Sequence, residues 1–104
     1  MTPLMIFVTC PDEPEAARLA RHVVAEGLAA CGNIVPAIRS IYRWEGQVQD
    51  DGESLLILKS SAEQYEALEK MIADQHPYDV PEVLALPIER GLPGYLQWMA
   101  EGLR

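Results

Sequence analysis

The sequence predicts a single α+β domain, and three observations support this. Runs of consecutive apolar residues alternate with stretches whose apolar residues recur at helical spacing, in the order β-α-β-β-α-β-α. The chain has 104 residues, enough for one hydrophobic core and too few for two. Two β-α-β units of this length indicate a split β-α-β, ferredoxin-like sheet with helices on one face. We therefore expect residues 1–104 to form one such domain.

The first strand and helix are marked by an apolar run followed by helix-start residues. Residues 4–9 are continuously apolar up to Cys10, as in a buried strand. Asp12 and Glu15 then stand at capping-box spacing, with Pro14 in the expected first turn. The residues that follow predict an amphipathic helix of about four turns. Its apolar face consists of Ala16, Leu19, Ala20, Val23 and Gly27.

A long β-hairpin is predicted in the middle of the chain. Residues 33–44 are rich in β-branched and aromatic side chains, and Pro36 among them indicates an edge position or a bulge. Glu45 and Gly46 are typical of a turn, and residues 47–59 return as a strand. We expect that strand to be broken or bulged at residues 50–52. At roughly 3.3 Å per residue, the hairpin arms overshoot the neighbouring strands by several residues.

The last third of the chain predicts two more helices and one strand. Ser60 and Glu63 form a second capping signature. The helix that it opens has an apolar face made of Tyr65, Leu68, Met71 and Ile72. The segment HPYDVPE, residues 76–82, interrupts the helical pattern before an apolar strand at 83–88. A short third helix is indicated by Leu96, Met99 and Leu103.

The strand sequences also predict self-association. Three runs, LMIFV, LLILK and VLALPI, are apolar at consecutive positions, whereas a sheet with one wet face shows alternation. The predicted helices cover only one face, so the other face is expected to meet a partner subunit. An overshooting hairpin also offers a strand edge for pairing between subunits. We therefore expect an obligate homo-oligomer.

Composition excludes several function classes. The formal net charge is −8, with sixteen acidic and eight basic residues, so the chain repels phosphate backbones and we expect no nucleic-acid partner. The apolar run near Met1 is too short for a membrane span or signal peptide, which favours a cytoplasmic protein with no membrane partner. No serine elbow, glycine-rich phosphate loop or activated cysteine is present, so we expect no catalytic residues and no enzyme.

Five motifs give the chain a family resemblance: TCPDE, LAACGNIVP, SIYRWEG, LLILKS and HPYDVPEVLALPI. In order and spacing they resemble the CutA family of divalent-cation tolerance proteins. This resemblance implies a ferredoxin-like homotrimer whose long hairpins augment neighbouring subunits. It also implies a response to metal ions, with copper or another divalent ion as ligand and no obligate cofactor. The fold is similar to the nitrogen-regulatory signalling trimers, and the alternative function is a small-molecule sensor with a pocket between subunits.

Cys10 and His76 are the candidate metal ligands. The last strand runs antiparallel to the first, so its entry loop lies at the same end of the sheet as Cys10. A thiolate and an imidazole suit copper or zinc, but a closed tetrahedral site needs four ligands. His76 is a single histidine, and Val8 stands where the family can carry a cysteine, so we expect weak binding. Cys31 is expected at the opposite end, roughly 15 Å or more from Cys10.

Lys59 and the hairpin aromatics are candidates for a pocket or an interface. Lys59 ends an apolar run, either as a strand terminator that reaches solvent or as a positive charge in a pocket between subunits. Arg39, Tyr42 and Trp44 would join it across an interface, or serve there as packing residues. Tyr78 is expected to pack beneath the turn before the last strand. An acylphosphatase-like hydrolase on this fold is disfavoured, because no arginine-bearing phosphate cradle follows the first strand.

Overall fold

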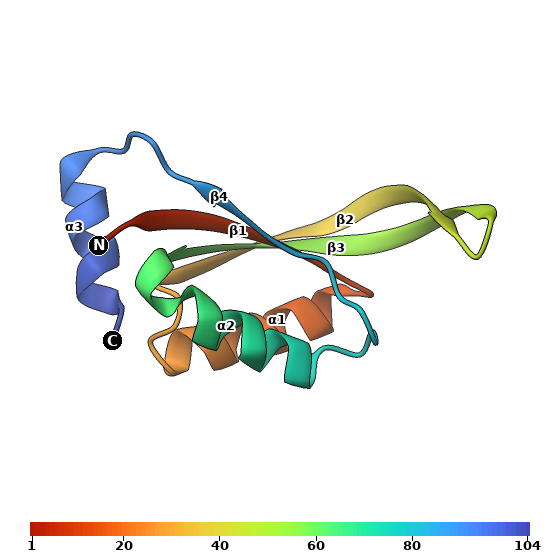
Figure 1. Cartoon of the computed structure of the whole chain (residues 1–104), viewed down its shortest axis with the longest axis horizontal. Helices are drawn as coiled ribbons and strands as arrows, with labels where there is room; N and C mark the ends of the chain where they lie inside the picture. The colour runs from red at the N-terminus through yellow and green to blue at the C-terminus, as the bar shows by residue number, and fades with distance from the viewer.

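The computed structural model describes all residues, 1–104, and confirms the predicted order of elements. The four strands form one antiparallel sheet in the order β2-β3-β1-β4. Helices α1 and α2 lie on one face of the sheet, and α3 lies at the end away from the hairpin tip (Figure 1). No helix is long and apolar enough to cross a membrane. The elements are β1 (Pro3–Cys10), α1 (Glu13–Ala25), β2 (Cys31–Trp44), β3 (Gln47–Ser61), α2 (Ala62–Gln75), β4 (Val83–Pro87) and α3 (Pro93–Gly102).

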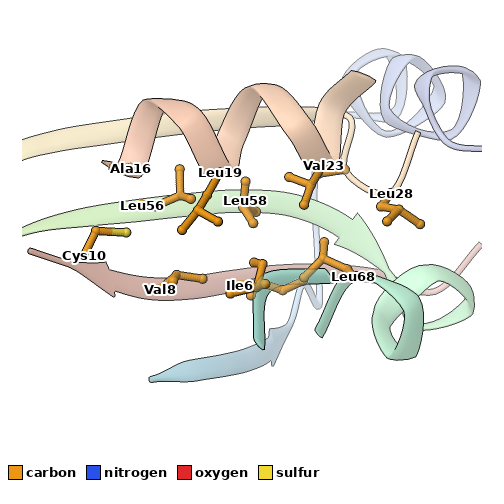
Figure 2. Close-up of a cluster of buried hydrophobic side chains, with 12 residues drawn as sticks. Ile6, Val8, Cys10, Ala16, Leu19, Val23, Leu28, Leu56, Leu58 and Leu68 are labelled. Atoms are coloured by element: carbon orange, nitrogen blue, oxygen red, sulfur yellow. The ribbon is translucent and has the colours of Figure 1, made fainter. Parts of the chain in front are cut away.

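The hydrophobic core lies between the sheet and the two covering helices (Figure 2). Alternate residues of β1 and β3 point into it, and the residues between them, such as Met5, Phe7 and Ile57, are half-buried on the opposite side. We call that opposite side the open face. The consecutive apolar residues of the strands are thus divided between a closed core and an open face. The core includes Ile6, Val8, Cys10, Ala16, Leu19, Val23, Leu56, Leu58, Leu68 and Ile72.

The predicted start of α1 is confirmed. Asp12 is the N-cap residue, and its side-chain oxygen accepts a hydrogen bond of 2.9 Å from the backbone N–H of Glu15. Pro14 occupies the first turn, where its missing N–H has no cost. This cap satisfies one of the orphan donors of the helix and fixes the direction in which the chain leaves β1.

The predicted cap of the second helix was wrong by one residue. Ser60 is still part of β3, and its hydroxyl donates to the Leu28 carbonyl oxygen at 2.5 Å. Pairing with β1 continues through Ser61, so the strand holds the residue that the sequence pattern assigned to the cap. Glu63 instead accepts a hydrogen bond of 2.8 Å from the backbone N–H of Thr2, which ties the chain start to α2.

The hairpin contains one bulge, and it lies on β2. The register shifts between Val35 and Ile38, where β2 carries one residue more than β3, which confirms the bulge predicted at Pro36. The predicted break at residues 50–52 was wrong, because β3 pairs with β2 continuously through them. Asp50 and its neighbour, which favour turns in isolation, are held in the strand by cross-strand partners on β2.

The hairpin projects beyond the rest of the sheet, as predicted. Only residues 54–61 of β3 pair with β1, so residues 47–53 extend as part of a two-stranded ribbon for roughly 23 Å. This ribbon gives the molecule its longest dimension of 44 Å (Figure 1). Its apolar side chains lie in solvent, including Ile41, Trp44 and Val48 at 65%, 58% and 71% exposed. A two-stranded ribbon of this kind is marginally stable alone, which makes it a surface suited to association.

Candidate functional site

His76 is held at the end of α2 by both of its ring nitrogens. The residue is 8% exposed, and its Nε2 lies 2.8 Å from the Thr9 carbonyl oxygen. Its Nδ1 accepts a hydrogen bond of 3.0 Å from the backbone N–H of Tyr78. The ring is therefore the neutral tautomer with the proton on Nε2, and its one lone pair is already engaged. In this state the imidazole has no free electron pair for a metal.

Cys10 lies at the same end of the sheet, as expected, but it is fully buried in the core. Burial raises the pKa of its thiol to about 11, and the carboxylates of Glu15, Glu53 and Asp12 add to this shift. A metal binds the thiolate, so this environment disfavours ligation. No group of three or more His, Cys, Asp or Glu residues in the chain is arranged to hold a metal ion. Metal binding by Cys10 and His76 stays a prediction.

Tyr78 connects the loop after α2 to the base of the hairpin. Its ring packs on His76 with a centroid distance of 4.7 Å, and its hydroxyl donates to Glu53 Oε2 at 2.9 Å. Burial, followed by this hydrogen bond, raises the pKa of Tyr78 well above its usual value. Residues 76–82 thus form a turn that is fastened to β1 through His76 and to β3 through Tyr78.

Lys59 sits in a small polar cluster on the open face. Lys59 and Cys31 are directly opposed across β3 and β2, with Nζ 3.9 Å from Sγ. The same ammonium donates to Asn33 Oδ1 on β2. On α3, burial and then the neighbouring Cys31 thiol raise the pKa of Tyr95. We call Cys31, Asn33, Lys59 and Tyr95 the Lys59 cluster.

The sequence analysis identified Lys59 but missed the other three members of the cluster. Cys31 was separated correctly from Cys10, because Cys31 pairs with Lys59, whereas Cys10 pairs with Ser54, five residues before Lys59 on β3. The position of Cys31 opposite Lys59, however, depends on the register of the hairpin. The signal that could have found it is the turn at Glu45, from which residues can be counted outward if the bulge at Pro36 is included.

The hairpin candidates do not join Lys59 within one chain. Tyr42 pairs with Gln49, ten residues along β3 from Lys59, or roughly 33 Å. The Tyr42 hydroxyl donates to Asp51 at 2.6 Å. Arg39 donates two hydrogen bonds, of 2.8 and 2.6 Å, to Asp50. This guanidinium holds the pKa of the Asp50 carboxyl below its usual value. A site that combines the ribbon with Lys59 would therefore need a second copy of the chain.

Two hollows of the surface lie away from Lys59. They have volumes of about 350 and 270 Å³ and lie on the outer surface of the helices, one along α1 and one beside α2. Neither is lined by a member of the Lys59 cluster. Neither hollow therefore forms a site with Lys59.

Comparisons with known proteins identify the family. The profile of the CutA1 divalent ion tolerance protein matches residues 4–102. The chain is 47% identical to Protein CutA of Mus musculus over 89% of its length, but spans only 52% of that protein. It is 44% identical to the divalent-cation tolerance protein CutA of Thermus thermophilus, covering 93% of this chain and 94% of that one.

A solved structure agrees with the fold over the whole chain. The crystal structure of CutA1 from Oryza sativa superimposes with a TM-score of 0.97 at 45% sequence identity. The alignment covers 100% of this chain and 95% of that one. Agreement of the sequence profile, the relatives and the structure leaves one assignment: the chain belongs to the CutA1 divalent ion tolerance protein family.

Proposed function

We propose that this chain works as a homotrimer in divalent-cation tolerance, binding copper or a related divalent ion weakly and catalysing no reaction. The observation that carries the proposal is the family match combined with an uncovered apolar surface. The strand order β2-β3-β1-β4, with α1 and α2 on one face, supports the ferredoxin-like description.

The open face and the ribbon support assembly. On the open face, Leu84 and Leu86 of β4 are 57% and 49% exposed and stand beside Phe7 and Met5 of β1. The outer edge of β4 pairs with no strand of its own chain, so its backbone groups are available to another. We expect the ribbon, which projects about 23 Å, to pair with the β4 edge of a neighbour. Hairpin exchange of this kind would bury both apolar surfaces at once.

The state of the two candidate ligands explains why metal binding should be weak. A metal at His76 must replace the hydrogen bond with either Thr9 or Tyr78, and a metal at Cys10 must remove a proton from a buried thiol. Both steps cost free energy before any metal–ligand bond forms. Cys31 is half-buried on the open face, which makes it the more accessible thiol and a rival ligand.

Titration of the intact protein with copper(II) and zinc, with native mass spectrometry in parallel, tests the proposal. The proposed site predicts that Cys10→Ser and His76→Ala each reduce the binding heat and leave the mass trimeric. His22→Ala, which alters an exposed histidine on α1, is the matched control and should bind as the wild type does. Binding that is lost only in Cys31→Ser would move the site to the open face. A monomer at micromolar concentration would refute the assembly.

A second candidate function is a small-molecule sensor with its site between subunits. The observation that favours it is the Lys59 cluster, which gathers polar side chains on an otherwise apolar surface. Such a convergence of a few polar groups within apolar surroundings is typical of ligand sites. The chemistry of this cluster limits which ligands it could take.

A further inference from the structure

Lys59 occupies an unusual position for a cation. Among the lysines and arginines of the four strands, it alone has a register position on the open face, because Arg39 and Arg43 alternate to the other side. Its cross-strand neighbour on β1 is Met5, and Ile57 precedes it on the same face. In the proposed trimer, on which this inference rests, a second copy covers this surface. An ammonium removed from water is costly unless an anion pairs with it.

No anion of the same chain pairs with Lys59. Its ammonium contacts only Asn33 Oδ1 and Cys31 Sγ, and it takes part in none of the four ion pairs of the chain. An ammonium has three donors, so one remains after these two contacts. With its oxygen turned to Lys59, the Asn33 amide has two further N–H donors, and these bind no acceptor in the chain. Lys59 and Asn33 together therefore offer several unused donors and one uncompensated positive charge.

Of the four carboxylates between residues 38 and 53, only Glu45 at the hairpin turn has no hydrogen bond or ion pair in its own chain. Asp50 is bound to Arg39, Asp51 to Tyr42, and Glu53 to Tyr78, in each case within the same chain. Bringing one of these carboxylates to Lys59 would break an existing hydrogen bond. A free anion avoids that cost.

We propose that Lys59 and Asn33 bind the oxyanion head, a carboxylate or a phosphate, of a small organic ligand between subunits. The surroundings suit an apolar body on that ligand. Met5 on β1 pairs with Lys59 on β3 and with Leu86 on β4. The Leu86 side chain is 49% exposed. On α3, Tyr95 is paired with Trp98 at a centroid distance of 5.4 Å, and both rings are partly exposed. Charge-assisted hydrogen bonds would fix the head, and apolar burial would add affinity.

Titration calorimetry of the full chain with benzoate, phenyl phosphate and neutral benzamide tests this assignment. At least one anion should bind, and benzamide should bind about tenfold more weakly or not at all. K59Q should lower the affinity for that anion by about tenfold or more while the protein stays trimeric in sedimentation. K70Q is the matched control, because Lys70 is exposed on α2 and paired with Asp74. Its affinity should equal that of the wild type.

The outcomes separate this inference from the assembly on which it rests. A wild-type trimer that binds neither anion, or a K59Q variant that binds as well as the wild type, overturns the ligand site and leaves the assembly standing. If K59Q loses the trimer and the wild type binds no anion, the partner of Lys59 is a carboxylate of a neighbouring copy. That result also overturns the ligand site. A monomeric wild type refutes the assembly itself.

Discussion

Replacement of His76 by alanine should destabilise the protein strongly even when no metal is present. The change leaves the Thr9 carbonyl and the Tyr78 N–H without their partner, at about 1 kcal/mol each when water can partly replace it. Loss of the ring contact at 4.7 Å from Tyr78 adds about 0.5–1 kcal/mol, and the vacated volume adds more. We expect the free energy of unfolding to fall by about 2–4 kcal/mol, a large share of a typical stability.

Urea denaturation with a chelator present, at a fixed protein concentration, measures this change. The concentration must be fixed because dissociation and unfolding are coupled in an oligomer. His22→Ala serves as the control: this histidine is exposed and hydrogen-bonds only to the side chain of Gln75. We expect it to change the free energy of unfolding by about 0.5 kcal/mol or less. A loss equally small in His76→Ala would show that the two hydrogen bonds do not hold the loop, and would refute the reasoning.

Three further predictions concern packing, pH and assembly. Gly32→Ala would place a Cβ 3.2 Å from both Ala20 Cβ and Leu58 Cδ2, so denaturation should show a loss of about 1–2 kcal/mol, and unchanged stability would contradict this crowding. Because the pKa of Cys10 rises from 9.0 to about 11 on folding, the unfolded chain ionises first. The free energy of unfolding should therefore fall by roughly 2 kcal/mol between about pH 9 and pH 11, and Cys10→Ala should flatten this slope. If the chain assembles as proposed, Trp44→Ser on the ribbon should weaken the proposed trimer about tenfold or more in dilution experiments, and an unchanged dissociation constant would exclude Trp44 from the interface.

The order of elements could be predicted from the sequence because local signals determine it. Asp12 and Pro14 mark a helix start with short-range chemistry, and the structure has the helix there. The errors occurred where tertiary pairing overrode such signals. Ser60 looks like a cap, but pairing with β1 keeps it in the strand. Residues 50–52 look like a break, but cross-strand partners hold them extended.

The candidate site was less predictable because its contacts join distant parts of the chain. The partner of His76 is the carbonyl of Thr9, a backbone group that any residue could supply, so no side-chain pattern reveals it. The Lys59 cluster combines β2, β3 and α3, and its composition depends on strand register. The turn and the bulge together set the register. A bulge was expected at Pro36, but the number of extra residues in it, and therefore the pairing beyond it, could not be read from the sequence.

The extra residue at Pro36 decides which side chains of the hairpin share a surface. With it, odd-numbered residues of β2 up to Val35 lie on the open face, and beyond it the even-numbered Tyr42 and Trp44 do. Deletion of one residue here would restore strict alternation of the two faces along β2. If the turn kept its register, Cys31 would still stand opposite Lys59 and Gly32 opposite Leu58, because the deleted residue is the one without a partner on β3. A one-residue deletion at the bulge would thus keep the inner and outer surfaces of β2 in place. The same deletion between Ile38 and the turn, with the bulge retained, would exchange the two surfaces over the rest of the strand, a larger change than any single substitution in the hairpin could produce.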